Sequence, residues 1–480
     1  MRSKITLLYD WVDERTGIRE ILQLALDEPI RGGARWSYVF GSILVFLFLL
    51  QVVTGIFLTM YYVPSADHAH TSVSYIQKVM PGGALIRGIH SYGASAMVLT
   101  LFAHLSQTFL FGAHKGKREL LWGVGVIMML LTFGFAFTGY LLPWDQEAYF
   151  GTKVGTAIAG EVPIVGPFQQ RLLLGGTNLT SLTISRFFTI HTFLLPLSIG
   201  LLIIGHIYLF RRAGAAGPFD NKKDHQVDRF YPKQLFKDSV AMLLVFIVLV
   251  AIVHYWPAQL GPEADPTSDF LARPPWYFLP LFQLLKYFPG KLSLIPTVIL
   301  PVLFFAVLFL LPFIDRREIR HPFKRPVAIT MMIATMIVVA SLVALSKYQD
   351  QRDPNASAKL KKQDEDAQAF LKTAFKVQEI GKAPDKSVST GSSLAGIKGE
   401  PPVAYVSSCA VCHGDHGEGD VGPALFDNPS KPSRSKDEMF KLLQDSRAYG
   451  LKDPMPASFP DLTDKEKRDI AEWLESAGKK

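Results

Sequence analysis

Residues 88–104 read GIHSYGASAMVLTLFAH and residues 191–206 read HTFLLPLSIGLLIIGH, and these two apolar stretches decide the fold. Each carries two histidines, at a spacing of 14 in the first stretch and 15 in the second: His90 and His104, then His191 and His206. On an α-helix, a side chain 14 positions further on returns to nearly the same face, about 21 Å along the axis. Two such helices side by side would therefore present imidazoles at an upper and a lower level.

The four histidines favour the binding of two haems at two depths in a membrane. One histidine on an apolar face is more often a hydrogen-bonded packing residue, but imidazoles in matched register on two helices are typical of axial ligands to iron. Glycines repeat at the interval of 14 in two neighbouring apolar stretches: Gly41 and Gly55, then Gly125 and Gly139. A helix wall without Cβ atoms admits a porphyrin edge, although small residues also serve close packing between membrane helices.

The composition is that of a membrane protein, because 49% of the 480 residues are hydrophobic. An apolar run of about 20 residues is long enough to cross a bilayer. Seven runs are expected to do so: 37–62, 84–112, 120–142, 185–210, 238–257, 294–314 and 327–345. We expect the first of them to act as an uncleaved insertion signal. The predicted fold is therefore an all-α, polytopic membrane helix bundle.

Basic residues gather on one side of this bundle if successive spans alternate in direction. They precede the first span and occupy the loops after the second, fourth and sixth, as with Lys115, Arg211 and Arg316. The positive-inside rule makes that side cytoplasmic, so we expect a cytoplasmic N-terminus and a C-terminus on the outer face. The net charge of +8 reflects these loops and indicates no nucleic-acid partner, since residues 401–480 carry 11 Lys and Arg against 14 Asp and Glu.

Four parts are expected along the chain: a four-helix dihaem domain, a three-helix domain, a polar linker and a small α-helical domain, at 1–215, 216–345, 346–400 and 401–480. The linker is expected to have no core of its own, apart from a short helix near 364–377, and the last domain should end in a helix at 463–477. Two long loops on the outer side, 143–184 and 258–293, are too apolar for disorder and are typical of functional loops.

The C-terminal domain carries the attachment signature of a c-type haem. The only two cysteines, Cys409 and Cys412, are followed directly by His413 in the pattern C-x-x-C-H. The cysteines would form thioethers with the porphyrin, and the histidine would be an axial ligand; a disulfide or half of a zinc site is the alternative. Met455, between two prolines, is the expected sixth ligand, whereas Met439 shares helical spacing with leucines and is expected in the core.

Residues 1–345 resemble cytochrome b of the quinol–cytochrome c reductase (cytochrome bc) family, and most of all its photosynthetic type, with the four-span and three-span pieces fused. The resemblance rests on motifs in order along the membrane part: LYDW at 8–11, IRGIH at 86–90, GYLLPWDQ at 139–146, RFFTIH at 186–191, GPEADP at 261–266 and HPFKRPVA at 321–328. Residues 401–480 resemble a small monohaem class I cytochrome c. Two non-covalent b haems and one covalent c haem are implied.

The family resemblance also implies how the b haems are held, one near the outer face and one near the cytoplasm: His90 with His191, and His104 with His206. Arg87 and Arg118 match arginines that contact haem propionates in the family; anchoring at the membrane interface is the alternative for both. Pro196 can kink the fourth span and absorb the extra residue of its 15-residue spacing. Val39 stands where the photosynthetic type anchors an extra haem by a cysteine, so no covalently held third membrane haem is expected.

The quinol pocket departs from the family pattern. The family carries a Pro-Glu-Trp-Tyr segment whose glutamate accepts a proton, whereas this chain has Pro274, Pro275, Trp276 and Tyr277. Three nearby acids could replace the lost carboxylate, although each alone is more often a solvated loop charge: Glu263, Asp265 and Asp269. Gly151 matches a glycine that lines the same pocket.

These features predict the membrane electron-transfer subunit of a quinol–cytochrome c oxidoreductase, with menaquinol as the expected quinol. Quinol would be oxidised on the outer face; one electron would cross through the b haems to a quinone, and the other would reach the c haem through a Rieske iron–sulfur protein. A soluble or membrane cytochrome c or an oxidase would be the acceptor, in a homodimeric complex of the bacterial inner membrane. The alternative is a dihaem conduit or membrane anchor that links the quinone pool to another redox enzyme; such anchors lack a counterpart of Trp276 and Tyr277.

Overall fold

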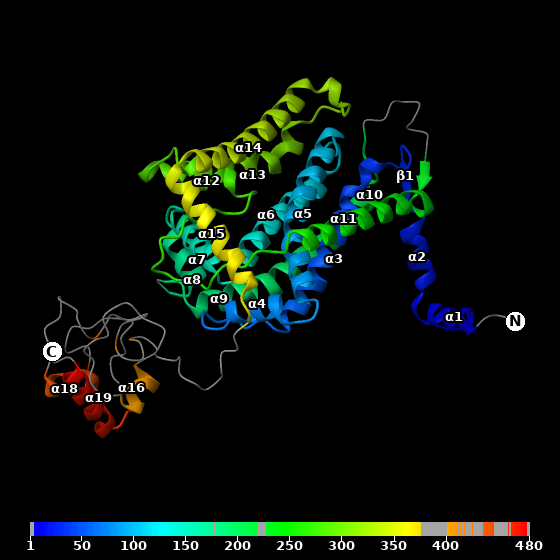
Figure 1. Ribbon diagram of the computed structural model, residues 1–480. Helices are drawn as coiled ribbons and strands as arrows, with labels where there is room; N and C mark the ends of the chain where they lie inside the picture. The colour runs from blue at the N-terminus through cyan, green and yellow to red at the C-terminus, as the bar shows by residue number, and fades with distance from the viewer. Residues whose placement is uncertain are drawn as a thin grey trace. The chain divides into compact units, whose positions relative to one another are not determined.

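The computed structural model describes residues 4–176, 178–217 and 227–375, and in the C-terminal part residues 401–409, 413, 417, 425, 435–445, 459 and 462–477. The chain divides into two compact units, Met1–Lys376 and Val377–Lys480. Figure 1 shows the helices of each unit with their labels.

Within the described residues, seven helices are long and apolar enough to cross a membrane. They are α3 (Val39–Thr59), α5 (Gly83–Leu110), α6 (Glu119–Leu141), α9 (Ser181–Thr189) continued by α10 (Leu195–Ala213), α11 (Leu235–Tyr255), α13 (Leu300–Ile314) and α14 (Pro326–Arg352). Apolar residues surround most of these helices instead of occupying one face, which is typical of helices in lipid. The expected all-α membrane bundle is confirmed, and each expected span overlaps one of these helices.

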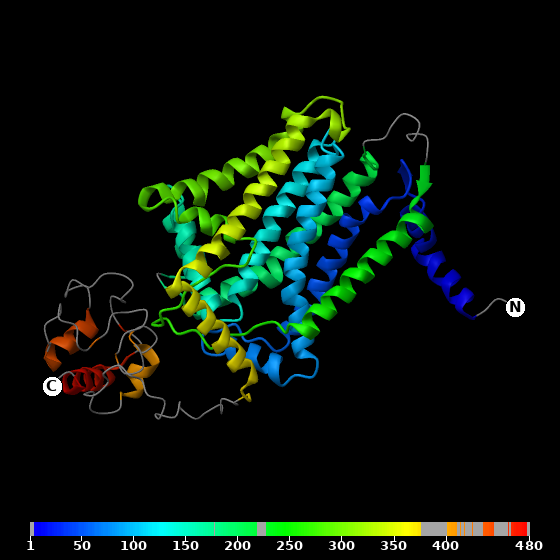
Figure 2. The same ribbon diagram turned by 45° about the horizontal axis from the view of Figure 1, so that its top comes forward.

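The histidine-bearing helices each lie beside a glycine-bearing helix. α3 packs against α5, α6 packs against α10, and α11 lies along both α3 and α5. Figure 2 shows α3 (blue), α5 (cyan) and α11 (green) running alongside one another. A buried apolar cluster that includes Ile43, Leu47 and Leu249 joins α3 to α11. This packing places Gly41 and Gly55 on the helix next to His90 and His104.

The fourth span changes its winding at its first histidine. Residues Ile190–Leu194 form a π-helical turn, η2, which joins α9 to α10. A π turn holds one residue more than an α turn, and Pro196 just after it lacks the N–H that a continuous α-helix would use. The extra residue in the spacing between His191 and His206 is thus taken up in this turn.

The two long loops fold into short helices at one end of the bundle, which we call the α7 end. These helices are α7 (Gln146–Gly160), α8 (Gly166–Leu174) and α12 (Leu279–Leu285), and α4 (Ala69–Lys78), from the loop after the first span, lies at the same end (Figure 1). Asp145 begins α7: its Oδ1 accepts a hydrogen bond from the backbone N–H of Ala148, as an N-cap does, and its Oδ2 accepts one from Gly261. One side chain therefore ties the first long loop to the second.

The segment after the last span differs from the expected linker in its described part. After Asp353 caps its N-terminus, α15 (Pro354–Lys372) runs across the α7 end (Figure 1). It is held on α4 by Lys78, whose Nζ donates to the Phe370 carbonyl at 2.6 Å. In its described part, residues 346–375, this segment is therefore more helical than expected and packs on the bundle, and Asp353 before Pro354 is the sequence signal for the start of α15.

The opposite end of the bundle carries the N-terminal segment. α1 (Lys4–Thr16) and α2 (Ile18–Leu26) precede β1 (Pro29–Arg31), which pairs antiparallel with β2 (Val227–Arg229). The β pair ties the entrance of the first span to the entrance of the fifth. Short turns complete this unit: η1 (Trp36–Tyr38), η3 (Phe230–Gln234), η4 (Gly290–Ser293), η5 (Ile295–Ile299) and η6 (Pro322–Lys324).

In the C-terminal unit, α16 (Val403–Ser408), α18 (Lys436–Gln444) and α19 (Asp464–Ala477) surround a small apolar core. The rings of Tyr405 and Trp473 lie at its centre with their centroids 4.5 Å apart. Met439 packs against this core, as expected, and α19 agrees with the helix expected at 463–477.

Candidate haem and quinol sites

The two histidines nearest the α7 end face each other across the bundle. The ring centroids of His90 on α5 and His191 in the π turn are 6.2 Å apart, and the ring planes are inclined by 70°. Two bonds of about 2 Å from imidazole nitrogens to one metal ion, added to the ring radii, require roughly 6 Å between the centroids. The separation therefore fits one iron held between the two rings.

A threonine sets the tautomer of each of these histidines. Thr54 Oγ1 lies 3.0 Å from Nδ1 of His90, and Thr138 Oγ1 lies 3.0 Å from Nδ1 of His191. Each hydroxyl donates its own proton to the carbonyl four residues earlier in its helix, at 2.7 Å and 2.8 Å respectively. Because a hydroxyl has one proton, Nδ1 must donate to the threonine and Nε2 keeps its lone pair. Nε2 is then the atom available to a metal in both rings.

Each of the four spaced glycines lies against one of the four histidines. A Cβ atom would lie 3.6 Å from His104 Cε1 at Gly41, 3.3 Å from His90 Cε1 at Gly55, 3.4 Å from His206 Cε1 at Gly125, and 2.5 Å from His191 Cε1 at Gly139. The equal intervals in the sequence thus correspond to direct neighbours in space. Glycine is required most strictly at position 139, where any side chain would displace the ring.

The second pair, His104 and His206, lies towards the opposite end of the bundle. The two rings are within electrostatic range of each other, and both side chains are half-buried. Among the described residues, no side chain hydrogen-bonds to the buried Nδ1 atom of either ring, so no threonine sets the tautomer of this pair as it does for His90 and His191. In the described part of the chain, no three His, Cys, Asp or Glu side chains converge. Histidine pairs alone leave a metal ion short of ligands, so they fit iron whose remaining ligands come from a porphyrin.

Two buried arginines lie near the two histidine levels. Arg87 donates to the Gln77 side chain at 2.7 Å, and Arg118 donates to the carbonyls of Ala213 and Gly214 at 2.7 and 2.8 Å. Burial, together with neighbouring arginine charges, lowers the pKa of Arg118 to about 10. An anionic group beside Arg118 would therefore be stabilised, and a haem propionate has that charge.

The expected quinol segment lies at the α7 end. The rings of Trp276 and Tyr277 meet edge to face with centroids 5.4 Å apart. The preceding Arg273 forms a two-point ion pair with Asp350 of α14, at 2.8 Å for both contacts, which fixes the segment to the last span. Gly151 of α7 packs directly on the ring of Tyr140 in α6, leaving no room for a Cβ.

The three acids considered as substitutes for the lost glutamate have other neighbours. Asp265 is exposed and accepts hydrogen bonds from Thr267, and Asp269 pairs with Lys359 of α15. Glu263 is exposed beside α4; the protein atoms around it raise its pKa, and the charge of His70 opposes the shift. Sequence reasoning overlooked a fourth acid, Glu147; its signal was a carboxylate one helical turn before Gly151.

In the C-terminal unit, Cys409 and His413 lie one helical turn apart. The backbone N–H of His413 donates to the Cys409 carbonyl at 2.9 Å. Cys409 is buried in the core beside Tyr405 and Trp473, so a porphyrin attached there would extend that core. Cys412 and Met455 lie outside the described residues.

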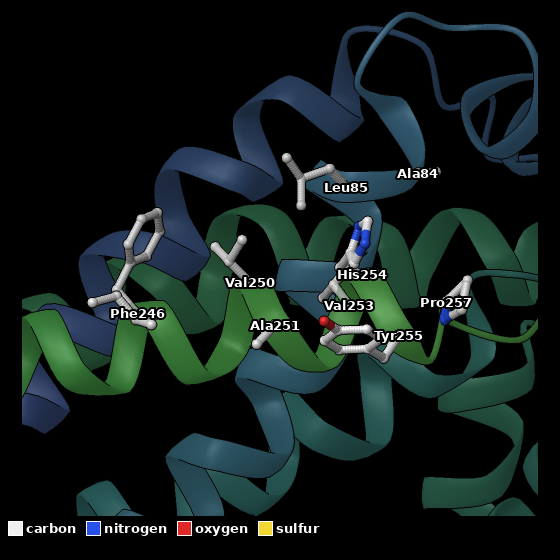
Figure 3. Close-up of a pocket in the computed structure, with 10 residues that line it drawn as sticks. Ala84, Leu85, Phe246, Val250, Ala251, Val253, His254, Tyr255 and Pro257 are labelled. Carbon is white, nitrogen blue, oxygen red and sulfur yellow. The ribbon is translucent and has the colours of Figure 1, made fainter.

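An apolar groove of about 680 Å³ lies between the start of α5 and the second half of α11. Leu85, Val250 and His254 line it, as Figure 3 shows. Leu85 and Tyr255 at its rim are exposed on the bundle surface. The groove holds none of the residues expected to bind haem or quinol, and it is a feature of the lipid-facing surface.

Three family models match the chain in succession. The cytochrome b/b6/petB model matches residues 26–214, the cytochrome b(C-terminal)/b6/petD model matches 266–359, and the model of cytochrome C oxidase, cbb3-type, subunit III matches 400–474. A cytochrome bc complex cytochrome b subunit of Chlorobaculum thiosulfatiphilum is 37% identical over 325 residues, which cover 66% of this chain and 75% of that relative. The chain belongs to the cytochrome b family. The resemblance expected from its motifs is confirmed, including the cytochrome c domain.

Two further similarities support a place in a bc-type complex. A menaquinol:cytochrome c reductase cytochrome b subunit of Geobacillus thermodenitrificans is 42% identical over 219 residues, 44% of this chain and 98% of the relative. The solved structure of a hyperthermophilic respiratory Complex III has a TM-score of 0.64 and 28% identity, covering 75% of this chain and 96% of that one. This cytochrome b is an integral membrane subunit of a bc-type complex that transfers electrons, and its domains imply haem b and haem c.

Thr138 offers a direct test of whether His90 and His191 hold a haem. Valine at this position removes the hydroxyl that accepts from His191 Nδ1 and makes the imidazole a weaker donor to iron. We expect Thr138→Val to raise the midpoint potential of one b haem and to weaken its retention, as measured by redox titration. Thr132→Val is the matched control, because the Thr132 hydroxyl of the same helix bonds only to its own backbone, at Met128. Identical titrations for Thr138→Val and the wild type would contradict the role of Thr138.

Proposed function

We propose that this cytochrome b oxidises a quinol at the α7 end, and that menaquinol is that quinol. The observation that carries the proposal is the facing pair His90 and His191, 6.2 Å apart, at the end of the bundle that also holds Gly151 and Tyr277. The menaquinol-linked relative and the absence of the family glutamate from the Pro274–Tyr277 segment support the choice of quinol.

The chain's own side chains would hold three haems. Nε2 atoms would bind the two b-haem irons, one between His90 and His191 and the other between His104 and His206. The c haem would be held by the C-x-x-C-H residues and a methionine: Cys409, Cys412, His413 and Met455. When bound, these groups supply one-electron carriers at two depths of the membrane and one beyond it. Arg87 and Arg118 would neutralise propionates, and the four spaced glycines would leave room for the porphyrin edges.

At the α7 end, the residues would bind and orient the quinol. Trp276 and Tyr277 would provide aromatic walls, Pro274 would stiffen the segment, and Gly151 would let the ring approach α7. Glu263 lies beside α4 and would receive protons on their way to the outer water.

The proposed arrangement across the membrane follows the positive loops. The N-terminus would be cytoplasmic, and the α7 end and the c domain would face outward from a bacterial inner membrane. Moving one charge against 100 mV requires about 2.3 kcal/mol. Electron transfer between the two histidine pairs would move charge across the membrane and so contribute to the membrane potential. The chain would then consist of a dihaem domain (1–215), a domain with the quinol loop (216–345), a connector (346–400) and an electron-accepting domain (401–480).

Three partners would complete the reaction. A Rieske iron–sulfur protein would take one electron, since both cysteines of this chain lie in the C-x-x-C-H motif. A soluble or membrane cytochrome c or an oxidase would accept from the c haem, and a second copy of the complex would form a homodimer. The quinone pool supplies and receives the small-molecule substrate.

Turnover of the purified complex tests the proposal. With Rieske protein present, a menaquinol analogue should reduce the c haem, and a quinol-site inhibitor should stop this reduction. The matched control is the same mixture without Rieske protein, in which the c haem should stay oxidised. Reduction of the c haem that is insensitive to the inhibitor, or no reduction at all, would contradict the proposed function.

A further inference from the structure

Glu147 occupies a face of α7 that is expected to line the quinol pocket. It is the second residue of α7, and Gly151 follows one turn later on the same face. Tyr140 of α6 contacts both positions: its hydroxyl donates to the Glu147 carbonyl at 3.1 Å, and its ring packs on Gly151. Glu147 and Gly151 therefore both lie beside the ring of Tyr140.

The electrostatic surroundings of Glu147 suit a group that exchanges protons. Glu147 is an exposed residue, so a bound molecule or water can reach its carboxylate, although the protein atoms around it are dense enough to shift its pKa. The protein atoms around the carboxylate, followed by the charge of Asp145, raise the pKa of Glu147 to about 7. Burial and then the charge of Glu147 raise the pKa of Tyr277 to about 12, so these two groups are close enough to interact.

A pocket of about 170 Å³ is lined by Glu147 on one side and by residues of α15 on the other. Its charged lining consists of Asp145, Arg273 and Asp364 besides Glu147 itself. Both oxygens of Asp145 accept backbone hydrogen bonds, so this residue serves the fold. Asp364 on α15 is exposed and accepts from Gln259 at 2.9 Å. The pocket thus connects Glu147 with a carboxylate at the surface.

We propose that Glu147 accepts one of the two protons released by quinol oxidation, in place of the glutamate that the Pro274–Tyr277 segment lacks; this inference rests on the proposed function. The O–H bond of one quinol hydroxyl breaks, its proton moves to a carboxylate oxygen of Glu147, and the bonding pair stays on the quinol oxygen. The two electrons would go to the iron–sulfur partner and the b-haem pair of the proposed function, and the second proton would go to water. Glu147 then releases its proton through this pocket towards Asp364.

Substitution of Glu147 in the full complex tests this role. Proton transfer by a positioned side chain contributes about 100-fold or more to a rate, so Glu147→Gln should lower inhibitor-sensitive turnover at pH 7 by about that factor while the haem spectra stay unchanged. In the wild type, kcat should rise as the pH increases through about 7, because only the ionised carboxylate can accept a proton. The other titratable groups near Glu147 are unchanged in the variant: the Tyr140 and Tyr277 hydroxyls, Asp145, Arg273 and Asp364. The rise of kcat with pH should therefore be present in the wild type and absent from Glu147→Gln. Glu147→Asp should keep it.

Glu161→Gln is the matched control. Glu161 caps the far end of the same helix, and its carboxylate accepts from Thr297 at 3.2 Å, which a glutamine oxygen can also do. If Glu147→Gln turns over like the wild type with the same pH profile, or if both glutamine variants fall alike, the assignment of Glu147 is overturned while the proposed function stands. If the wild type itself shows no inhibitor-sensitive turnover, both are overturned.

Discussion

Replacing His191 with alanine is expected to remove one of the two b haems and to abolish quinol turnover. His90 would remain with its threonine partner, but a single imidazole leaves the iron one axial ligand short, and no other histidine among the described residues stands opposite. The purified variant should contain one b haem for each c haem, as measured by the reduced pyridine–haemochrome spectrum. Turnover should fall to background because the chain of carriers across the membrane is broken.

His254→Ala is the control for this variant. His254 lies on α11, lines the apolar groove and packs its ring against Tyr255, and it belongs to neither histidine pair. The His254→Ala protein should keep the full b-haem content and the wild-type rate of quinol turnover. A His191→Ala protein that retained two b haems per c haem would show that His191 is a packing residue.

Gly139→Ala should have an effect nearly as large, although it adds one methyl group far from any charge. That methyl carbon would lie 2.5 Å from Cε1 and 3.2 Å from Nδ1 and Nε2 of His191. The ring cannot retreat without losing its hydrogen bond to Thr138. We therefore expect a loss of b-haem content or a shifted haem spectrum, measured as for the histidine variant.

Gly134→Ala, five residues earlier on α6, separates this clash from any change in helix stability. A Cβ there would lie 3.8 Å from Leu195, an ordinary contact. Both substitutions should stabilise the isolated helix equally, by about 1 kcal/mol. Equal haem content in the two alanine variants would contradict the assigned role of Gly139.

The sequence was sufficient for the parts of the structure that follow from periodicity. The intervals between His90 and His104 and between Gly41 and Gly55 predicted which residues share a helix face, and the structure places each glycine against a histidine. The spans followed from apolar length alone, because a membrane-crossing helix needs an apolar surface nearly all round. The cytochrome c domain followed from five residues of local sequence, Cys409 to His413.

Features that depend on distant contacts could not be predicted in this way. The start of α15 has a sequence signal in Asp353 and Pro354, but its place on the bundle has none, because it is held by contacts such as Lys78 with Phe370, which are far apart along the chain. Glu147 was not singled out from the sequence, because the protein surroundings that raise its pKa come from folding. The π turn at His191 was visible only as a spacing of 15 and a nearby proline.

The measurement that tests the account most directly is the haem content of the purified wild-type chain. Paired imidazoles at two levels of the bundle, together with one C-x-x-C-H motif, predict two b haems for each c haem in the reduced pyridine–haemochrome spectrum. A ratio of one b haem per c haem, or a protein with c haem alone, would contradict it.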